Sequence, residues 1–198
     1  MTRSATRPNG RAERSRSLIL DATRELLATE GGVRALTVEA VAARSGVAKT
    51  TIYRRWPDKW ALALDAVMID MVPRFGVPED VGDTRAELIA FVWSVITLLA
   101  SPPFGPAMQA LMSEIATEPE LTKTYRSRGI EPRREILAEI IRRGVARGDL
   151  RPDTDTQLLH EFLLGPVFYR LLLSGGALDD ALAARLVDAV LAGFSPRP

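Results

Sequence analysis

Apolar residues recur along most of the chain at three- and four-residue spacing, as in an amphipathic helix, and no stretch alternates as a strand would. The first such face begins after Arg14 and ends before the pair Gly31-Gly32, which stops a helix. Its inward positions are expected to be Leu18, Ile19, Ala22, Leu26 and Leu27. Prolines 119 and 132 suit first helical turns. Further helices are predicted over residues 48–56, 59 to about 75, 84–100, 106 to about 117, a segment ending near 148, 155–174 and 178–194. The chain is therefore expected to be all-α.

Two short helices joined by a tight turn are predicted between Thr37 and Trp56. Thr37 can cap the first helix, and Gly46 allows a sharp turn before the second. Val47 and Ile52 are expected to face inwards. The other side chains of the second helix are polar or charged, and most must face outwards: Lys49, Thr50, Thr51, Tyr53, Arg54 and Arg55. Cations can contact phosphates, and hydroxyl and guanidinium groups can reach base edges, so the segment is predicted to be a DNA-binding helix-turn-helix.

The charge distribution agrees with a polyanion partner for the first part of the chain. Residues 1–60 hold 12 Lys and Arg against 6 Asp and Glu, whereas residues 61–198 hold 14 against 19. A basic head on a mildly acidic body favours a nucleic acid partner, although a solvated basic tail would give the same balance.

Composition excludes several other classes. The 198 residues include no cysteine, so there is no disulfide, thiolate metal site or cysteine nucleophile. Residues 1–16 are rich in Arg, Ser and Thr and lack the apolar core of a signal peptide. The longest uncharged run, residues 88–113, is broken by prolines and is too short on either side to span a bilayer. We therefore expect a cytoplasmic protein with no membrane partner.

Candidate catalytic and metal-binding groups are few. His160 is the one histidine and has no second histidine or cysteine with which to share a metal, so we interpret it as a polar residue on a half-exposed helix. Glu114 and Glu161 are interpreted as surface or ion-paired carboxylates rather than an acid–base pair. No nucleophile elbow, phosphate loop or dinucleotide fingerprint occurs. No cofactor, metal or enzymatic activity is predicted.

Three segments of the head, residues 36–42 (LTVEAVA), 45–49 (SGVAK) and 52–59 (IYRRWPDK), make residues 14–67 resemble the N-terminal domain of TetR-family transcriptional regulators. The resemblance implies a three-helix DNA-binding head on an all-helical body that binds ligand and dimerises. It implies phosphate or groove contacts from Thr37, Lys49, Thr50, Tyr53 and Lys59, and base reading by some of Thr50, Thr51, Arg54 and Arg55. Ala48, Thr50 and Trp56 replace residues that are common in the family, so no particular operator sequence is transferred.

A homodimer is expected to form through residues 155–194. Apolar residues recur every fourth position in the last helix, at Leu178, Leu182, Leu186, Val190 and Phe194. A matching surface is offered by Leu158, Leu159, Phe162 and Leu163. The resemblance implies that these two helices pack against their two-fold mates.

A ligand pocket is expected in the body, because Gly165-Pro166 interrupts the predicted helix 155–174 and can open space beside helix 84–100. The predicted lining residues are Trp93, Ile96, Met108, Met112, Phe162 and Phe168, although plain core packing would suit each of them. The expected effector is a small, largely apolar molecule.

The sequence thus predicts a head at residues 1–60, a body at residues 61–198, and a ligand-responsive repressor that binds a palindromic double-stranded operator as a dimer. The alternatives are a ligand-independent architectural DNA-binding protein or an activator, and a small all-helical enzyme. An enclosed cavity in the body would favour the first prediction, and a fully packed body would favour the architectural protein.

Overall fold

The computed structural model describes residues 9–29, 31–68, 78–115 and 117–194. It contains helices and no strand within these ranges, as the periodicity predicts. In chain order the elements are α1 (Asn9–Thr29), α2 (Val38–Ser45), α3 (Lys49–Arg55), α4 (Lys59–Met68), α6 (Thr84–Ala100), α7 (Phe104–Ile115), α8 (Pro119–Tyr125), the π-helical turn η1 (Arg126–Ile130), α9 (Glu131–Arg147), α10 (Thr156–Tyr169), the π-helical turn η2 (Arg170–Ser174) and α11 (Asp180–Phe194).

Turn chemistry sets several of these boundaries. Gly31 and Gly32 both have positive φ, which residues with a side chain rarely adopt, and they follow α1 as predicted. Pro119 and Pro132 lie in the first turns of α8 and α9. The helix predicted from residue 59 to about 75 is described as far as Met68, and the rest of that prediction lies outside the described residues.

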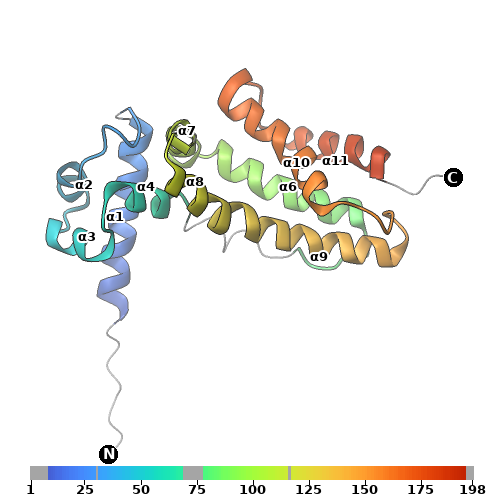
Figure 1. The fold of residues 1–198 in the computed structure, drawn as a ribbon, viewed down its shortest axis with the longest axis horizontal. Coiled ribbons are helices and arrows are strands. Elements are labelled where there is room, and N and C mark those ends of the chain that lie inside the picture. Colours follow the sequence, from blue (N-terminus) through green and yellow to red (C-terminus); the bar gives the residue numbers. More distant parts are fainter. Residues whose placement is uncertain (1–8, 30, 69–77, 116, 195–198) are drawn as a thin grey trace, which may run out of the picture.

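The helices α1 to α4 form the head at one end of the molecule (Figure 1). On α1 the side chains of Ile19, Ala22, Leu26 and Leu27 are buried as predicted. Leu18 is 47% exposed, so that part of the predicted face is wrong, and the neighbouring Leu20 is buried in its place. Helix α4 crosses the boundary expected near residue 60, because it packs on α1 and also contacts α7 and α8.

In the body, α6, α9, α10 and α11 lie side by side, and α7 and α8 lie between them and the head (Figure 1). Helix α6 packs against α7, α9, α10 and α11, which bury most of its large apolar side chains. Burial of this apolar surface is the main source of stability of the body.

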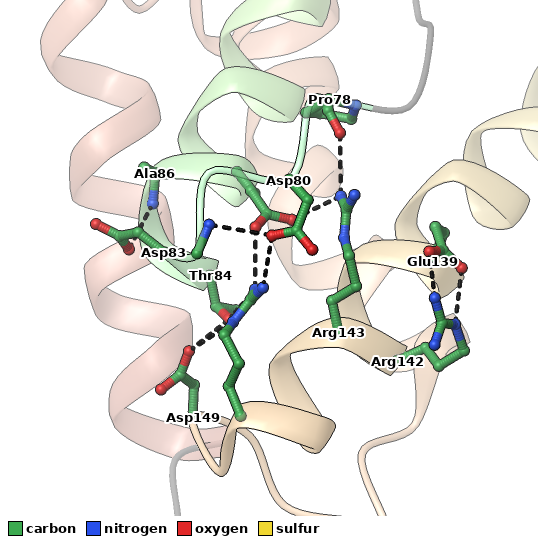
Figure 2. Close-up of polar contacts among 12 residues, drawn as sticks. Pro78, Asp80, Asp83, Thr84, Ala86, Glu139, Arg142, Arg143 and Asp149 are labelled. Atoms are coloured by element: carbon green, nitrogen blue, oxygen red, sulfur yellow. Dashed lines mark hydrogen bonds and ion pairs between the residues drawn. The ribbon is translucent and has the colours of Figure 1, made fainter.

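A buried ion cluster joins the start of α6 to the end of α9. The side chain of Glu87 is fully buried, with Nη2 of Arg143 2.6 Å from one carboxylate oxygen and Nη2 of Arg147 3.0 Å from the other. Around it, Arg143 donates to the carbonyl of Pro78 at 3.1 Å, and the Thr84 hydroxyl donates to Asp149 at 2.7 Å (Figure 2). The cluster fixes the segment that enters α6 against the last turns of α9.

No single helix in the described ranges is long and apolar enough to cross a membrane. Helices α6 and α7 reach that length only as a pair, and they are bent by 91° at the break between them.

Candidate nucleic-acid interface and ligand cavity

The turn between α2 and α3 has the geometry of a helix-turn-helix. The Thr37 hydroxyl accepts a hydrogen bond of 3.1 Å from the backbone N–H of Ala40 and caps α2, as predicted. Gly46 ends α2 in the left-handed region with φ of 69°, which permits the sharp turn. Ile52 is 1% exposed and anchors α3 against the head core. The inward and outward faces of α3 are therefore fixed by packing.

The outward face of α3 carries four exposed polar residues: Lys49, Thr50, Tyr53 and Arg54. Tyr53 is 52% exposed, so its ring and hydroxyl are accessible to a partner. Lys49 donates to Glu39 at 2.8 Å, and this hydrogen bond raises the pKa of Lys49 and lowers the pKa of Glu39. A phosphate that contacts Lys49 must therefore compete with Glu39.

The remaining predicted DNA-binding residues have contacts within the head. Thr37 is exposed, and its hydroxyl already accepts the hydrogen bond that caps α2. Thr51 is half-buried. Arg55 donates to the carbonyl of Ala12 at 2.9 Å and thereby ties α3 to α1. Lys59 donates to the carbonyl of Arg34 at 2.6 Å and lies 5.6 Å from the ring centre of Trp60. Arg55 and Lys59 thus help to position α3.

Asp65 joins α3 to the body, a role that the sequence did not reveal. Its carboxylate accepts a hydrogen bond of 2.9 Å from the indole N–H of Trp56, the residue that ends α3. The guanidinium of Arg128, in η1, lies 2.5 Å from the same carboxylate. Arg34 in the head also pairs with Glu114 of α7 at 2.9 Å. A shift of η1 would therefore be transmitted to the end of α3.

The body contains a cavity of about 380 Å³ between α7, α8, η1, α9, α10 and η2. It opens to solvent, so it is a surface pocket rather than the enclosed cavity that was expected. Its volume lies in the range of small-molecule sites. Most of its wall is apolar, with a few polar groups, and the lining residues are Met112, Tyr125, Ile130, Arg133, Arg134, His160, Glu161, Leu164, Gly165, Phe168 and Leu172. Gly165 borders this cavity, but the cavity lies towards α9 and no residue of α6 lines it, so the expected position beside α6 is wrong.

Two of the six predicted ligand-binding residues, Met112 and Phe168, line this cavity. The other four do not line it. Ile96 and Met108 are completely buried in the core, and Trp93 is half-buried on α6. Phe162 is 50% exposed and packs edge-on against Phe194, with ring centres 6.3 Å apart. Residue type alone could not decide among them, because the helix crossings determine which side chains meet.

The polar groups of the cavity include His160 and Arg133. Helix α10 is half-exposed as predicted, and His160 lies on its buried face with 7% of its surface exposed. Arg133 is 2% exposed and was not predicted as a site residue. Its position four and seven residues before Leu137 and Ile140 was the available signal, because this spacing places a cation on the apolar face of α9.

The single histidine is expected to make stability fall as the pH drops from about 6.5 towards 4. Burial, together with the nearby positive charges of Arg133 and Arg134, lowers the pKa of His160 to about 4. Between the two values the unfolded chain binds a proton that the folded protein does not, so unfolding becomes more favourable as the pH falls. We expect His160→Gln to reduce this fall in urea denaturation series. An equally steep fall in the variant would assign the effect to carboxylates instead.

Exposed apolar side chains follow one face of α10 and η2: Leu158, Phe162, Tyr169, Leu172 and Leu173. In the stripe predicted on the last helix, Leu182 is 2% and Phe194 8% exposed within one chain, whereas Leu178, Leu186 and Val190 are half-buried. Leu159 and Leu163, predicted as part of the matching surface, are fully buried as well. Close packing of α11 on α6 explains this difference.

An exposed, cationic second helix on a helix-turn-helix head, joined to a helical body, defines a DNA-binding regulatory protein. Two family models match: residues 19–66 match the model described as bacterial regulatory proteins of the tetR family, and residues 78–190 match the tetracyclin repressor-like C-terminal domain. The chain belongs to the TetR family of transcriptional regulators. This membership decides against the enzyme alternative.

Relatives along the whole chain agree with this assignment. The chain is 31% identical over 177 residues to the HTH-type transcriptional regulator YdeS of Bacillus subtilis, covering 89% of this chain and 88% of that protein. It is 32% identical over 190 residues to the DNA-binding transcriptional repressor TetR of Mycobacteroides abscessus, covering 91% of this chain and 94% of that protein. The crystal structure of the TetR family transcription regulator SCO0332 matches with a TM-score of 0.71 and 38% identity, covering 92% of this chain and 100% of that one.

Proposed function

We propose that this regulator is a ligand-responsive repressor that binds a palindromic operator as a homodimer, with α3 of each head in the major groove. The exposed polar face of α3, set by the burial of Ile52 on its other side, is the observation that carries this proposal. Repression rather than activation is supported by the name of the Mycobacteroides abscessus relative. Because the proposed partner is DNA, we also propose a cytoplasmic location.

Within this proposal the head residues divide into two groups. Lys49, Thr37 and Lys59 would contact phosphates. Thr50 and Arg54 would contact base edges, and Tyr53 would lie at the edge of the groove. Thr51 and Arg55 are less accessible, because Thr51 is half-buried and Arg55 bonds to α1. Lys49 would exchange Glu39 for a phosphate on binding.

The body cavity supports a ligand response rather than an architectural role. A ligand that fits one arrangement of α9 and α10 better than another would shift η1, and η1 contacts the head through the Arg128–Asp65 ion pair. Only such a difference in affinity can move the heads. A typical coupling free energy of about 1–3 kcal/mol would lower operator affinity about 5- to 150-fold.

The test begins with selection of bound duplexes from a randomised pool by the purified protein, followed by affinity measurement by fluorescence anisotropy. We expect an enriched palindrome. Lys49→Ala should weaken binding to all duplexes and flatten the dependence of log affinity on log salt by about 1.8, because each of the two heads loses one phosphate contact. Arg54→Ala should instead reduce discrimination at particular base pairs by about 5- to 150-fold.

Lys123→Ala provides the matched control, since it removes an exposed cation from α8 in the body. It should leave the affinity and the salt dependence of the wild type unchanged. If Lys49→Ala and Arg54→Ala behaved like Lys123→Ala, the assignment of α3 as the reading helix would be wrong.

A further inference from the structure

The guanidinium of Arg133 is buried without a counter-charge. It is 2% exposed and donates one hydrogen bond, of 3.2 Å, to the Tyr125 hydroxyl. It also lies 5.9 Å from the ring centres of Tyr125 and Phe168. Its Nε and Nη1 atoms are buried and have no hydrogen-bond partner, and no carboxylate pairs with it among the described residues. Arginine stays protonated in proteins, so the positive charge cannot be relieved by titration.

Burying the Arg133 guanidinium in this way is unfavourable in free energy unless an anion or hydrogen-bond acceptors pair with it. Removing a charge from water is unfavourable by several kcal/mol unless an opposite charge and hydrogen bonds replace the lost hydration. Cation–π contact with two rings offsets part of the cost and leaves the two donors unsatisfied. Arg133 lines the cavity, so a ligand there lies against this residue. Its Nε and Nη1 atoms are covered in the ligand-free structure, and the side chain has to rotate for them to bond to the ligand.

The charges around the cavity determine the sign and number of charges on such a ligand. Arg134 also lines the cavity and pairs with Glu161 at 3.7 Å, where the Glu161 side chain is 53% exposed at the rim. Glu161 therefore balances Arg134, and one net positive charge remains, on Arg133. The rest of the wall is mainly apolar, from Met112, Ile130, Leu164, Phe168 and Leu172.

We infer that the cavity binds a small monoanion with an apolar body, such as an aromatic carboxylate, with its charged group on Arg133. This inference rests on the proposed function in taking the cavity as the effector site. It changes the expected effector from a largely neutral molecule to an amphipathic anion, because the apolar wall is combined with an unpaired cation.

His160 supplies a second polar contact at the same place. Its Nε2 is buried without a hydrogen-bond partner, and it lines the cavity beside Arg133. The two arginines and burial hold its pKa at about 4, so the imidazole is neutral near pH 7 and can donate from one ring nitrogen. An anion placed between His160 and Arg133 would favour the protonated imidazole. Beside the two arginines, the cavity wall also carries the titratable groups of Glu161 and Tyr125.

The experiment compares 2-naphthoate with its neutral counterpart 2-naphthamide by calorimetric titration of the full chain without DNA. We expect the carboxylate to bind about ten- to a hundredfold more tightly, as charge-assisted hydrogen bonds allow. Arg133→Met should abolish this preference. Arg142→Met should retain it, since Arg142 lies on the same helix but is exposed and paired with Glu139. Because no DNA is present, a failure of operator release would leave this result unaffected.

A second readout uses the single histidine and separates a lost site from a misfolded variant. In nuclear magnetic resonance titrations of the wild type, saturating 2-naphthoate should raise the pKa of His160 and 2-naphthamide should not. Arg133→Lys, which keeps the cation, should keep part of the preference for the carboxylate. The inference is overturned if 2-naphthoate fails to bind at millimolar concentration, if both probes bind the wild type equally, or if the preference survives in folded Arg133→Met.

Discussion

Replacing Glu87 with glutamine is expected to lower the free energy of unfolding by about 3–5 kcal/mol, the range for removing one partner of a buried ion pair. The substitution keeps the shape of the side chain and removes the buried charge that pairs with both Arg143 and Arg147. The side chain of Arg143 is 12% exposed, so solvent can replace little of the lost interaction. Arg147 keeps Asp80 at 2.9 Å and Asp149 at 3.4 Å, so Arg143 should carry most of the cost.

Glu139→Gln is the matched control for this prediction. Glu139 pairs with Arg142 at 2.6 Å, the same distance as between Glu87 and Arg143, and both pairs involve α9 (Figure 2). This pair is exposed, so its removal should cause no resolved change in stability. The comparison therefore separates the effect of burial from the effect of distance.

Urea denaturation followed by circular dichroism would measure both variants, at a fixed chain concentration because association adds to apparent stability. A double-mutant cycle with Arg143→Gln would then isolate the coupling between the two side chains. Equal losses for Glu87→Gln and Glu139→Gln would contradict the view that the buried cluster holds α6 against α9.

The helices and the reading head could be predicted from the sequence because their determinants are local. The capping bond of Thr37, the left-handed turn at Gly46 and the inward position of Ile52 depend on residues that are close along the chain. Such local patterns predict the same local structure whatever the packing of the rest of the chain.

The cavity and the ion cluster could not be predicted in this way, because they depend on helices that are distant in the sequence. Glu87 meets Arg147 only because the start of α6 lies beside the end of α9. Trp93 and Met112 looked equally suited to a ligand site by residue type, yet only Met112 lies on the cavity wall. The helix crossings that separate them are set by packing of the whole body.

Phe162→Glu is expected to convert a dimer into single chains and to abolish tight operator binding. Phe162 is 50% exposed and Tyr169, further along the same face of α10, is 58% exposed, so the stripe presents an apolar surface of the kind that marks an interface. In an isologous interface each substitution occurs twice, and two carboxylates would be buried near the two-fold axis without partners. A single head loses the second half-site, which lowers affinity for a palindrome far more than for an isolated half-site.

Light scattering at micromolar concentration would give the mass of the wild type, expected to be twice the 21.7 kDa of one chain, and of each variant. Tyr169→Glu tests the same face without disturbing the contact between Phe162 and Phe194, so it guards against a loss of mass caused by local unfolding. Val81→Glu is the control, because Val81 is 61% exposed but lies outside the stripe, before α6. If Phe162→Glu and Tyr169→Glu both kept the mass of two chains, the interface would have to lie on another face, and the exposed stripe on α10 and η2 would need a different partner.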